Sequence, residues 1–95
     1  MKQPAIYIMT NKKHGTLYTG VTSDLIKRVW QHKSNAIKSF TSRYNVNQLV
    51  YYEIHGDAVE AIKREKNIQA WRREWKLALI EKDNPNWEDL YDEIV

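Results

Sequence analysis

The feature that most constrains the fold is a pair of short β-type runs separated by a turn. Residues 5–9 (AIYIM) and 16–21 (TLYTGV) alternate their side chains between two faces, as strands do. Only residues 10–15 (TNKKHG) lie between them, and Asn11 and Gly15 favour tight backbone turns. A crossover to a parallel strand needs a much longer connection, so the two runs must form an antiparallel hairpin.

The rest of the chain reads as one further strand among helices. A helix is expected over residues 22–33, where Thr22 or Ser23 can act as the cap and Leu25, Ile26, Val29 and Trp30 form the apolar face. Residues 34–46 are polar, basic and irregular, and residues 48–54 (QLVYYEI) read as a third strand.

Helical patterns fill the C-terminal part of the chain. Asp57 and Glu60 have the spacing of a capping box for a helix that runs to about Trp71. Residues 72–82 continue as helix, with a possible bend near 71–73 and with Trp75, Ala78 and Leu79 expected to face inward. Asn84 is expected to cap a last helix that Pro85 opens, with Trp87, Leu90, Tyr91 and Ile94 facing the core.

These elements predict an α+β fold in which a three-stranded antiparallel sheet is flanked by helices. The 95 residues make a single domain, 1–95, because a second core would not fit into this length. The chain contains no cysteine, which excludes disulfide frameworks and thiolate metal sites and suits the cytoplasm. Its longest apolar run is residues 5–9, so we expect neither a signal peptide nor a membrane span.

The positive charge is concentrated in the first half of the chain. Residues 1–55 hold eight Lys and Arg against two Asp and Glu, which gives +6, whereas residues 56–95 hold seven against ten, which gives −3. A basic half is typical of proteins that bind nucleic acid, although an ordinary solvated surface explains a net charge of +3 equally well.

Glu65 is the most unexpected residue of the C-terminal half. At about 100° per residue it falls in the middle of the stripe formed by Ala58, Ala61, Ile62, Ile68 and Gln69. Burying an unpaired carboxylate costs several kcal/mol. The helix can be shallow, Glu65 can pair with a buried Arg or Tyr, or it can hold a metal ion, and the residues alone favour the first two.

Two further pairs of polar residues suggest chemistry. Arg28 and His32 are one turn apart at the edge of the apolar face of the first helix, where Arg suits a phosphate and His suits proton transfer. Tyr7 and Tyr18 belong to neighbouring strands, and if they share a face, two adjacent phenols can lower the pKa of one. Each pair alone fits an ordinary helix edge or an aromatic cross-strand pair. Together with Glu65 they suit phosphodiester cleavage.

Taken together, these segments resemble a known family. AIY at 5–7 and YTG at 18–20 resemble the GIY-YIG signature, and LYTGVTSDLIKRVWQH, LVYYE and AIKREKNI strengthen the resemblance over nearly the whole chain. The chain is similar to small stand-alone bacterial GIY-YIG proteins related to the N-terminal nuclease domain of excinuclease ABC. Ala5 replaces the first Gly of the signature, and Thr19 replaces its second Ile.

The resemblance implies a ββαβαα-type fold, here with an extra C-terminal helix, and an endonuclease that cleaves DNA with Mg²⁺ or Mn²⁺, in DNA repair or recombination. It implies that Tyr7 is the general base, Tyr18 its hydrogen-bonded neighbour, Arg28 the residue that stabilises the transition state and His32 the proton-handling group. Glu65 is implied as the single metal ligand, emerging at the floor of a common cleft. Some members also use a late Asn, for which Asn67, Asn84 and Asn86 are available.

Two other functions remain open. One is a non-catalytic nucleic-acid-binding module on the same fold, and the other is a domain that only binds a protein partner. We expect nucleic acid, most simply DNA, to lie along the basic segment 27–44 through Lys27, Lys33, Lys38 and Arg43. No small-molecule cofactor or membrane partner is expected.

Overall fold

The computed structural model describes residues 3–36 and 40–95. The described elements are the strands β1 (Ala5–Thr10), β2 (Leu17–Thr22) and β3 (Gln48–Ile54) and the helices α1 (Leu25–Lys33), α2 (Phe40–Arg43), α3 (Ala58–Ala70), α4 (Arg73–Asp83) and α5 (Tyr91–Ile94). The α+β class and the three-stranded antiparallel sheet are as expected from the sequence.

The sheet has the order β2-β1-β3, so β1 is the central strand. It pairs antiparallel with both neighbours, and Tyr7 lies opposite Gly20 on β2 and Tyr52 on β3. All six residues of β1 are buried. The predicted hairpin is confirmed, and its register places Tyr7, Tyr18 and Gly20 on one face because side chains alternate along each strand.

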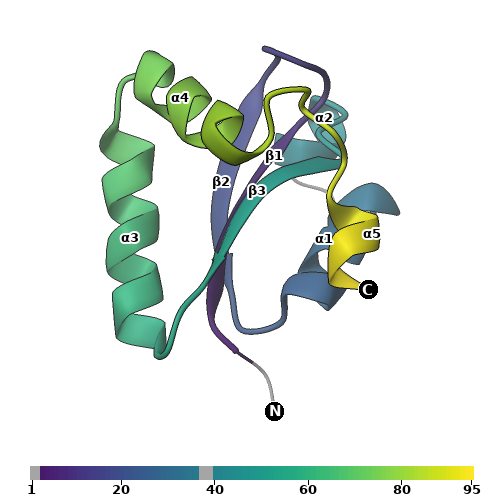
Figure 1. Cartoon of the computed structure of the whole chain (residues 1–95). Coiled ribbons are helices and arrows are strands. Elements are labelled where there is room, and N and C mark those ends of the chain that lie inside the picture. Colours follow the sequence, from purple (N-terminus) through teal and green to yellow (C-terminus); the bar gives the residue numbers. More distant parts are fainter. Residues whose placement is uncertain (1–2, 37–39) are drawn as a thin grey trace.

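Helices cover both faces of the sheet (Figure 1). On the face of Tyr7, the core contains Leu25 and Val29 of α1, and α5 packs against it through Tyr91 and Ile94. The opposite face carries Ile6 and Ile8, which pack against α3 and α4; the buried helical residues there are Ala61, Ile68 and Ile80. The sheet therefore separates the side chains of α1 from those of α3.

The inward face of α1 is narrower than the sequence pattern indicated. Leu25 and Val29 are buried, but Ile26 and Trp30 are about half exposed, at 46% and 54%. The helix packs on the sheet along a single line of side chains one turn apart, so its second apolar line faces outward. The segment after α1 also contains the short helix α2, where the sequence predicted irregular structure.

Helix α3 begins as predicted, and the Asp57 side chain accepts a hydrogen bond from the backbone N–H of Glu60. Its rotation differs from the predicted stripe, because Ala61 and Ile68 are buried while Ile62 is 43% exposed. The centre of the buried stripe therefore lies away from Ile62. Glu65, expected in the middle of the stripe, lies at its flank and is half-buried.

The break between α3 and α4 falls at Trp71 and Arg72, both of which have extended backbone. The predicted inward face of α4 is wrong. Trp75 is 52% exposed and Ala78 is exposed, whereas Ile80 is the buried residue of the helix. The break resets the phase of the helix, so a pattern continued from α3 cannot place its inward side.

The last helix is much shorter than predicted, because α5 covers only Tyr91–Ile94. Asn84 does not cap it. The buried Asn84 side chain instead donates hydrogen bonds to the carbonyl oxygens of Val50 and Glu88 and accepts one from the N–H of Glu88. This fixes a turn beside β3 in which Trp87 is buried with a positive φ of 57°.

Among residues 3–36 and 40–95, no helix has both the length and the apolar character needed to cross a membrane.

Candidate active site

The Tyr7 side chain is held in the centre of the α1 face of the sheet. Its ring is fully buried and lies across from Gly20, where a Cβ atom would be only 2.5 Å from both Cζ and Oη of Tyr7. The position next to Tyr7 on β2 must therefore lack a side chain. The Tyr18 ring lies on the same face, with its centroid 6.2 Å from that of Tyr7, as the hairpin register predicted.

Helix α1 brings His32 to the same place. The helix is capped by Asp24, whose Oδ1 accepts a hydrogen bond from the N–H of Lys27, so the cap is one residue later than Thr22 or Ser23. The Nε2 atom of His32 is 2.9 Å from the Tyr7 hydroxyl. The His32 ring also lies edge-on to Tyr18, with centroids 5.4 Å apart. The two tyrosines and His32 thus form one contact group.

Arg28 acts on this group from one turn earlier on α1. Burial raises the pKa of Tyr7 and the neighbouring Tyr18 raises it further, whereas the charge and hydrogen bonding of Arg28 lower it. The net pKa is well above the ordinary value, so the idea that paired phenols lower the pKa is wrong for Tyr7. The pKa of His32 is lowered, first by burial and then by the positive charge of Arg28. A neutral phenol therefore faces a neutral imidazole at pH 7.

Sequence reasoning missed Thr41. Its hydroxyl is 2.8 Å from Nδ1 of His32, and its side chain is buried in α2. Both ring nitrogens of His32 are therefore hydrogen-bonded within the protein. The only signal for this contact is a hydroxyl residue nine positions after His32, because the intervening segment has no clear periodicity.

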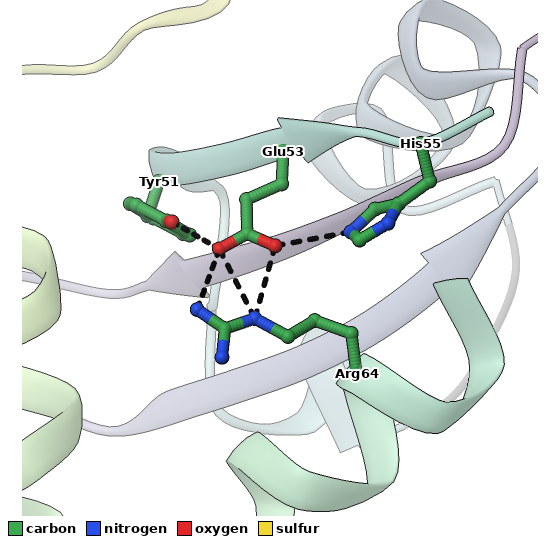
Figure 2. A network of polar contacts seen from close by, with 4 residues as sticks. All are labelled: Tyr51, Glu53, His55 and Arg64. Carbon is green, nitrogen blue, oxygen red and sulfur yellow. Dashed lines mark hydrogen bonds and ion pairs between the residues drawn. The ribbon is translucent and has the colours of Figure 1, made fainter. Parts of the chain in front are cut away.

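A second polar cluster joins β3 to α3 on the other face of the sheet (Figure 2). The Glu53 carboxylate accepts hydrogen bonds from Arg64, from His55 and from the Tyr51 hydroxyl, and the Arg64 Nη2–Oε2 distance is 2.8 Å. Burial alone raises the pKa of Glu53, but these hydrogen bonds outweigh it and the pKa is lowered. The cluster fixes one flank of α3 against β3.

The other flank of α3 lies at β2. The Gln69 side chain donates a hydrogen bond to the carbonyl oxygen of Thr19, at 3.3 Å. Glu65 precedes Gln69 by one helical turn and so lies on this flank, beside the edge strand β2. The contacts that join Tyr7, Tyr18 and His32 are on the opposite face, so the structure places Glu65 around the edge of the sheet from them rather than beneath them.

Glu65 suits a weakly held Mg²⁺ or Mn²⁺ ion. Magnesium keeps several of its waters and often takes only one or two carboxylates plus substrate phosphate. Glu65 is a hard oxygen donor with access to solvent at the strand edge. Across the described parts of the chain, no three Asp, Glu or His side chains gather as a ready-made metal site. The donor set therefore fits an ion whose coordination is completed by water and substrate.

The predicted nucleic-acid contacts divide into different environments. Lys27 is exposed and, with Arg28, lines a small polar pocket of about 150 Å³ at the start of α1. Lys33 forms an ion pair with Asp89, which ties α1 to the C-terminal segment. Arg43 is exposed and lies over the Tyr44 ring, whereas Lys38 falls outside the described residues.

The three late asparagines also differ. Asn67 and Asn86 are exposed, whereas the Asn84 side chain is occupied by its hydrogen bonds to the backbone. Asn84 is therefore a structural residue.

Known proteins match this chain in both sequence and structure. A UPF0213 protein of Staphylococcus saprophyticus is 39% identical over 80 residues, which are 84% of this chain and 96% of that protein. A UPF0213 protein of Staphylococcus epidermidis is 35% identical over 68 residues, which cover 72% of this chain and 83% of the relative. The solution NMR structure of a UPF0213 protein from Bacillus halodurans matches with a TM-score of 0.57 and 25% identity, over 92% of each chain.

The family comparison covers the elements that build the site. Residues 3–78 match the model of the GIY-YIG catalytic domain, and this range includes β1, β2, α1 and α3. The signature tyrosines Tyr7 and Tyr18 are the residues that meet His32 on the central part of the sheet. With its sequence, its sheet order and its paired tyrosines in agreement, the chain belongs to the GIY-YIG family, a superfamily of nucleases.

Proposed function

We propose that this protein is a divalent-metal-dependent endonuclease that hydrolyses phosphodiester bonds of DNA. The observation that carries the proposal is the 2.9 Å hydrogen bond between Tyr7 and His32, with Tyr18 packed against both rings, in a GIY-YIG chain. A cysteine-free chain suits the cytoplasm, and repair or recombination is the process in which such cleavage is useful.

Tyr7 and His32 act together as the base. Tyr7 is a neutral phenol in the free protein, so it can accept a proton from water only as its own proton passes to Nε2 of His32. The water oxygen then attacks phosphorus, and the bond to the 3′ oxygen breaks, leaving a 5′ phosphate. The leaving oxygen takes its proton from solvent, and His32 returns its extra proton to solvent after the reaction.

Tyr18 controls access to this base. Tyr7 is fully buried, and the half-buried Tyr18 ring lies against both Tyr7 and His32. Water can reach the Tyr7 hydroxyl only if the Tyr18 ring moves, so substrate binding must shift it. Active-site hydrogen bonds often tighten only when substrate is bound, which is consistent with a closed site in the free protein.

Arg28 supplies positive charge where negative charge develops. Its guanidinium is close enough to lower the pKa of Tyr7, and it also lines the exposed pocket at the start of α1. It therefore connects the buried phenol with the surface that a phosphate would approach. A guanidinium fork matches two phosphate oxygens and stabilises the charge of the transition state.

Glu65 would hold the Mg²⁺ or Mn²⁺ ion from the β2 edge. When bound, the ion supplies charge neutralisation at the leaving oxygen. Because Glu65 lies around the edge strand from Tyr7, the substrate phosphate must lie across β2 to meet both residues. DNA then contacts the start of α1 through Lys27, and Arg43 and Lys38 extend the basic surface. Lys33 contributes only where its ion pair with Asp89 opens.

The test is a cleavage assay on supercoiled plasmid and labelled branched DNA with Mg²⁺, Mn²⁺ or EDTA. Glu65→Gln keeps the shape of the side chain and removes its charge, and Glu60→Gln on the same helix is the matched control. We expect metal-dependent cleavage by the wild type and by Glu60→Gln, and none by Glu65→Gln.

Three other outcomes are informative. Cleavage that is equal in the wild type and Glu65→Gln contradicts the role of Glu65. Cleavage that persists in EDTA contradicts metal dependence. Absence of cleavage on every substrate, with salt-sensitive DNA binding retained, favours the alternative of a non-catalytic nucleic-acid-binding module on the GIY-YIG fold.

A further inference from the structure

We propose that Thr41 is a positioning residue that holds the imidazole of His32 in one tautomer, with the proton on Nδ1 and the lone pair on Nε2 facing Tyr7. This inference rests on the proposed nuclease function for its catalytic meaning. The tautomer itself is a property of the free protein.

The geometry gives His32 two fixed partners. Nε2 is 2.9 Å from the Tyr7 hydroxyl and Nδ1 is 2.8 Å from the Thr41 hydroxyl. Thr41 is 1% exposed, so water cannot readily replace it. Its own backbone is held in place because its carbonyl oxygen accepts a hydrogen bond from the N–H of Val46 at 2.8 Å. The imidazole ring is therefore clamped at both nitrogens by groups from β1 and α2.

The neutral imidazole must donate at one nitrogen and accept at the other. The Thr41 hydroxyl can serve either nitrogen state, since it both donates and accepts, so Tyr7 decides the direction. Arg28 can only donate, and it acts as a hydrogen-bond donor toward the Tyr7 oxygen. The phenolic hydrogen then needs an acceptor, and Nε2 of His32 is within hydrogen-bond distance. Nδ1 consequently carries the proton and donates it to Thr41.

This arrangement is the one that the proposed base requires. A lone pair on Nε2 can take the Tyr7 proton, whereas an N–H at Nε2 can only donate to it. After the transfer, both imidazole nitrogens carry protons, and the Nδ1–H still has Thr41 as its acceptor. Thr41 gains and loses no proton in the cycle. Its contribution is to keep the productive tautomer and ring orientation populated before water is activated.

The experiment compares Thr41→Val, which has the same shape without a hydroxyl, with Thr41→Ser, which keeps the hydroxyl. The first readout is the ¹⁵N NMR spectrum of the His32 ring in free protein at a pH where it is neutral. We expect a protonated Nδ1 in the wild type and Thr41→Ser, and a mixture with protonated Nε2 in Thr41→Val. The second readout is steady-state cleavage, where Thr41→Val should lower kcat by about 10- to 100-fold with little change in KM.

Two results would overturn the inference. One is a wild-type His32 that carries its proton on Nε2, which can be decided even if Thr41→Val fails to fold. The other is a folded Thr41→Val whose tautomer and kcat both match the wild type. If the wild type cleaves no DNA but shows a protonated Nδ1 that Thr41→Val alters, the nuclease proposal fails while the positioning of His32 by Thr41 stands.

Discussion

Gly20 is the residue whose substitution tests the geometry of the site most directly. An alanine Cβ at this position would lie 2.5 Å from Cζ and Oη of Tyr7 and 2.9 Å from Cε1. Ordinary contacts of a Cβ begin at about 3.4 Å, so the ring or the strand must move by roughly 1 Å. The ring has little freedom to do so, because it is fully buried and hydrogen-bonded to His32.

The expected loss of stability has two contributions. Overpacking of a filled core costs about 1–3 kcal/mol. A shift of this size also stretches the 2.9 Å bond between Tyr7 and His32 beyond hydrogen-bond range, and losing such a bond costs about 0.5–1.5 kcal/mol. We therefore expect Gly20→Ala to lower the free energy of unfolding by roughly 2–4 kcal/mol, which lowers Tm by about 10–25 °C in a domain of this size.

The measurement is denaturant and thermal unfolding of Gly20→Ala beside a matched control. Gly56→Ala is suitable, because nothing lies within 4 Å of the Cβ it would add and its φ is not positive. This control should remain within about 1 kcal/mol of the wild type, since removing a glycine stiffens the unfolded chain and offsets any small cost in the folded protein. In the cleavage assay, Gly20→Ala should lose activity at a temperature where it is still folded.

A double-mutant cycle identifies the clash as the cause. Tyr7→Leu removes Cζ, Cε1 and Oη, so adding Gly20→Ala to it should cost about 1–2 kcal/mol less than in the wild type. The reasoning is refuted if Gly20→Ala is as stable and active as Gly56→Ala, or if the cost of Gly20→Ala is the same with and without the Tyr7 ring.

Three further predictions concern other parts of the molecule. The lowered pKa of Glu53 means that its charged form stabilises the fold above pH 4.5 and that this stability is lost as the pH falls below 4.5; unfolding measured against pH should show this loss in the wild type but not in Glu53→Gln. At pH 7 the same substitution should cost about 1–3 kcal/mol, against less than about 0.5 kcal/mol for Glu74→Gln in an exposed ion pair. Arg28→Met should raise the pKa of His32 toward 6.5 in an NMR titration, and an unchanged pKa would contradict the electrostatic contact. Asn84→Ala should lower the free energy of unfolding by about 2–3 kcal/mol, because it leaves buried backbone groups without partners, and a change below about 0.5 kcal/mol would contradict its structural role.

The local patterns predicted the sheet and the hairpin half of the site well. The turn at 10–15 set the pairing of β1 with β2, and strand alternation then placed Tyr7 and Tyr18 on one face. Helical spacing similarly placed Arg28 and His32 one turn apart on α1. These relationships depend on short distances along the chain, where backbone geometry leaves few alternatives.

Relationships across the chain were harder to predict. Periodicity alone could not place the rotation of α3, which depends on the bonds of Arg64 to Glu53 at one flank and of Gln69 to Thr19 at the other. The short α5 depends likewise on Asn84 binding the backbone of β3. These contacts join residues that are 11 to 50 positions apart, and no pattern within one element encodes them.

The central position of β1 has a consequence for how the site is protected. Each residue of β1 is buried between two hydrogen-bonded neighbours, β2 from its own hairpin and β3 from far along the chain. Such a strand can exchange its amide hydrogens with solvent only when the whole domain opens. Hydrogen exchange at Tyr7 should therefore report the global free energy of unfolding, and the phenol should keep its place through every partial opening that leaves the sheet intact.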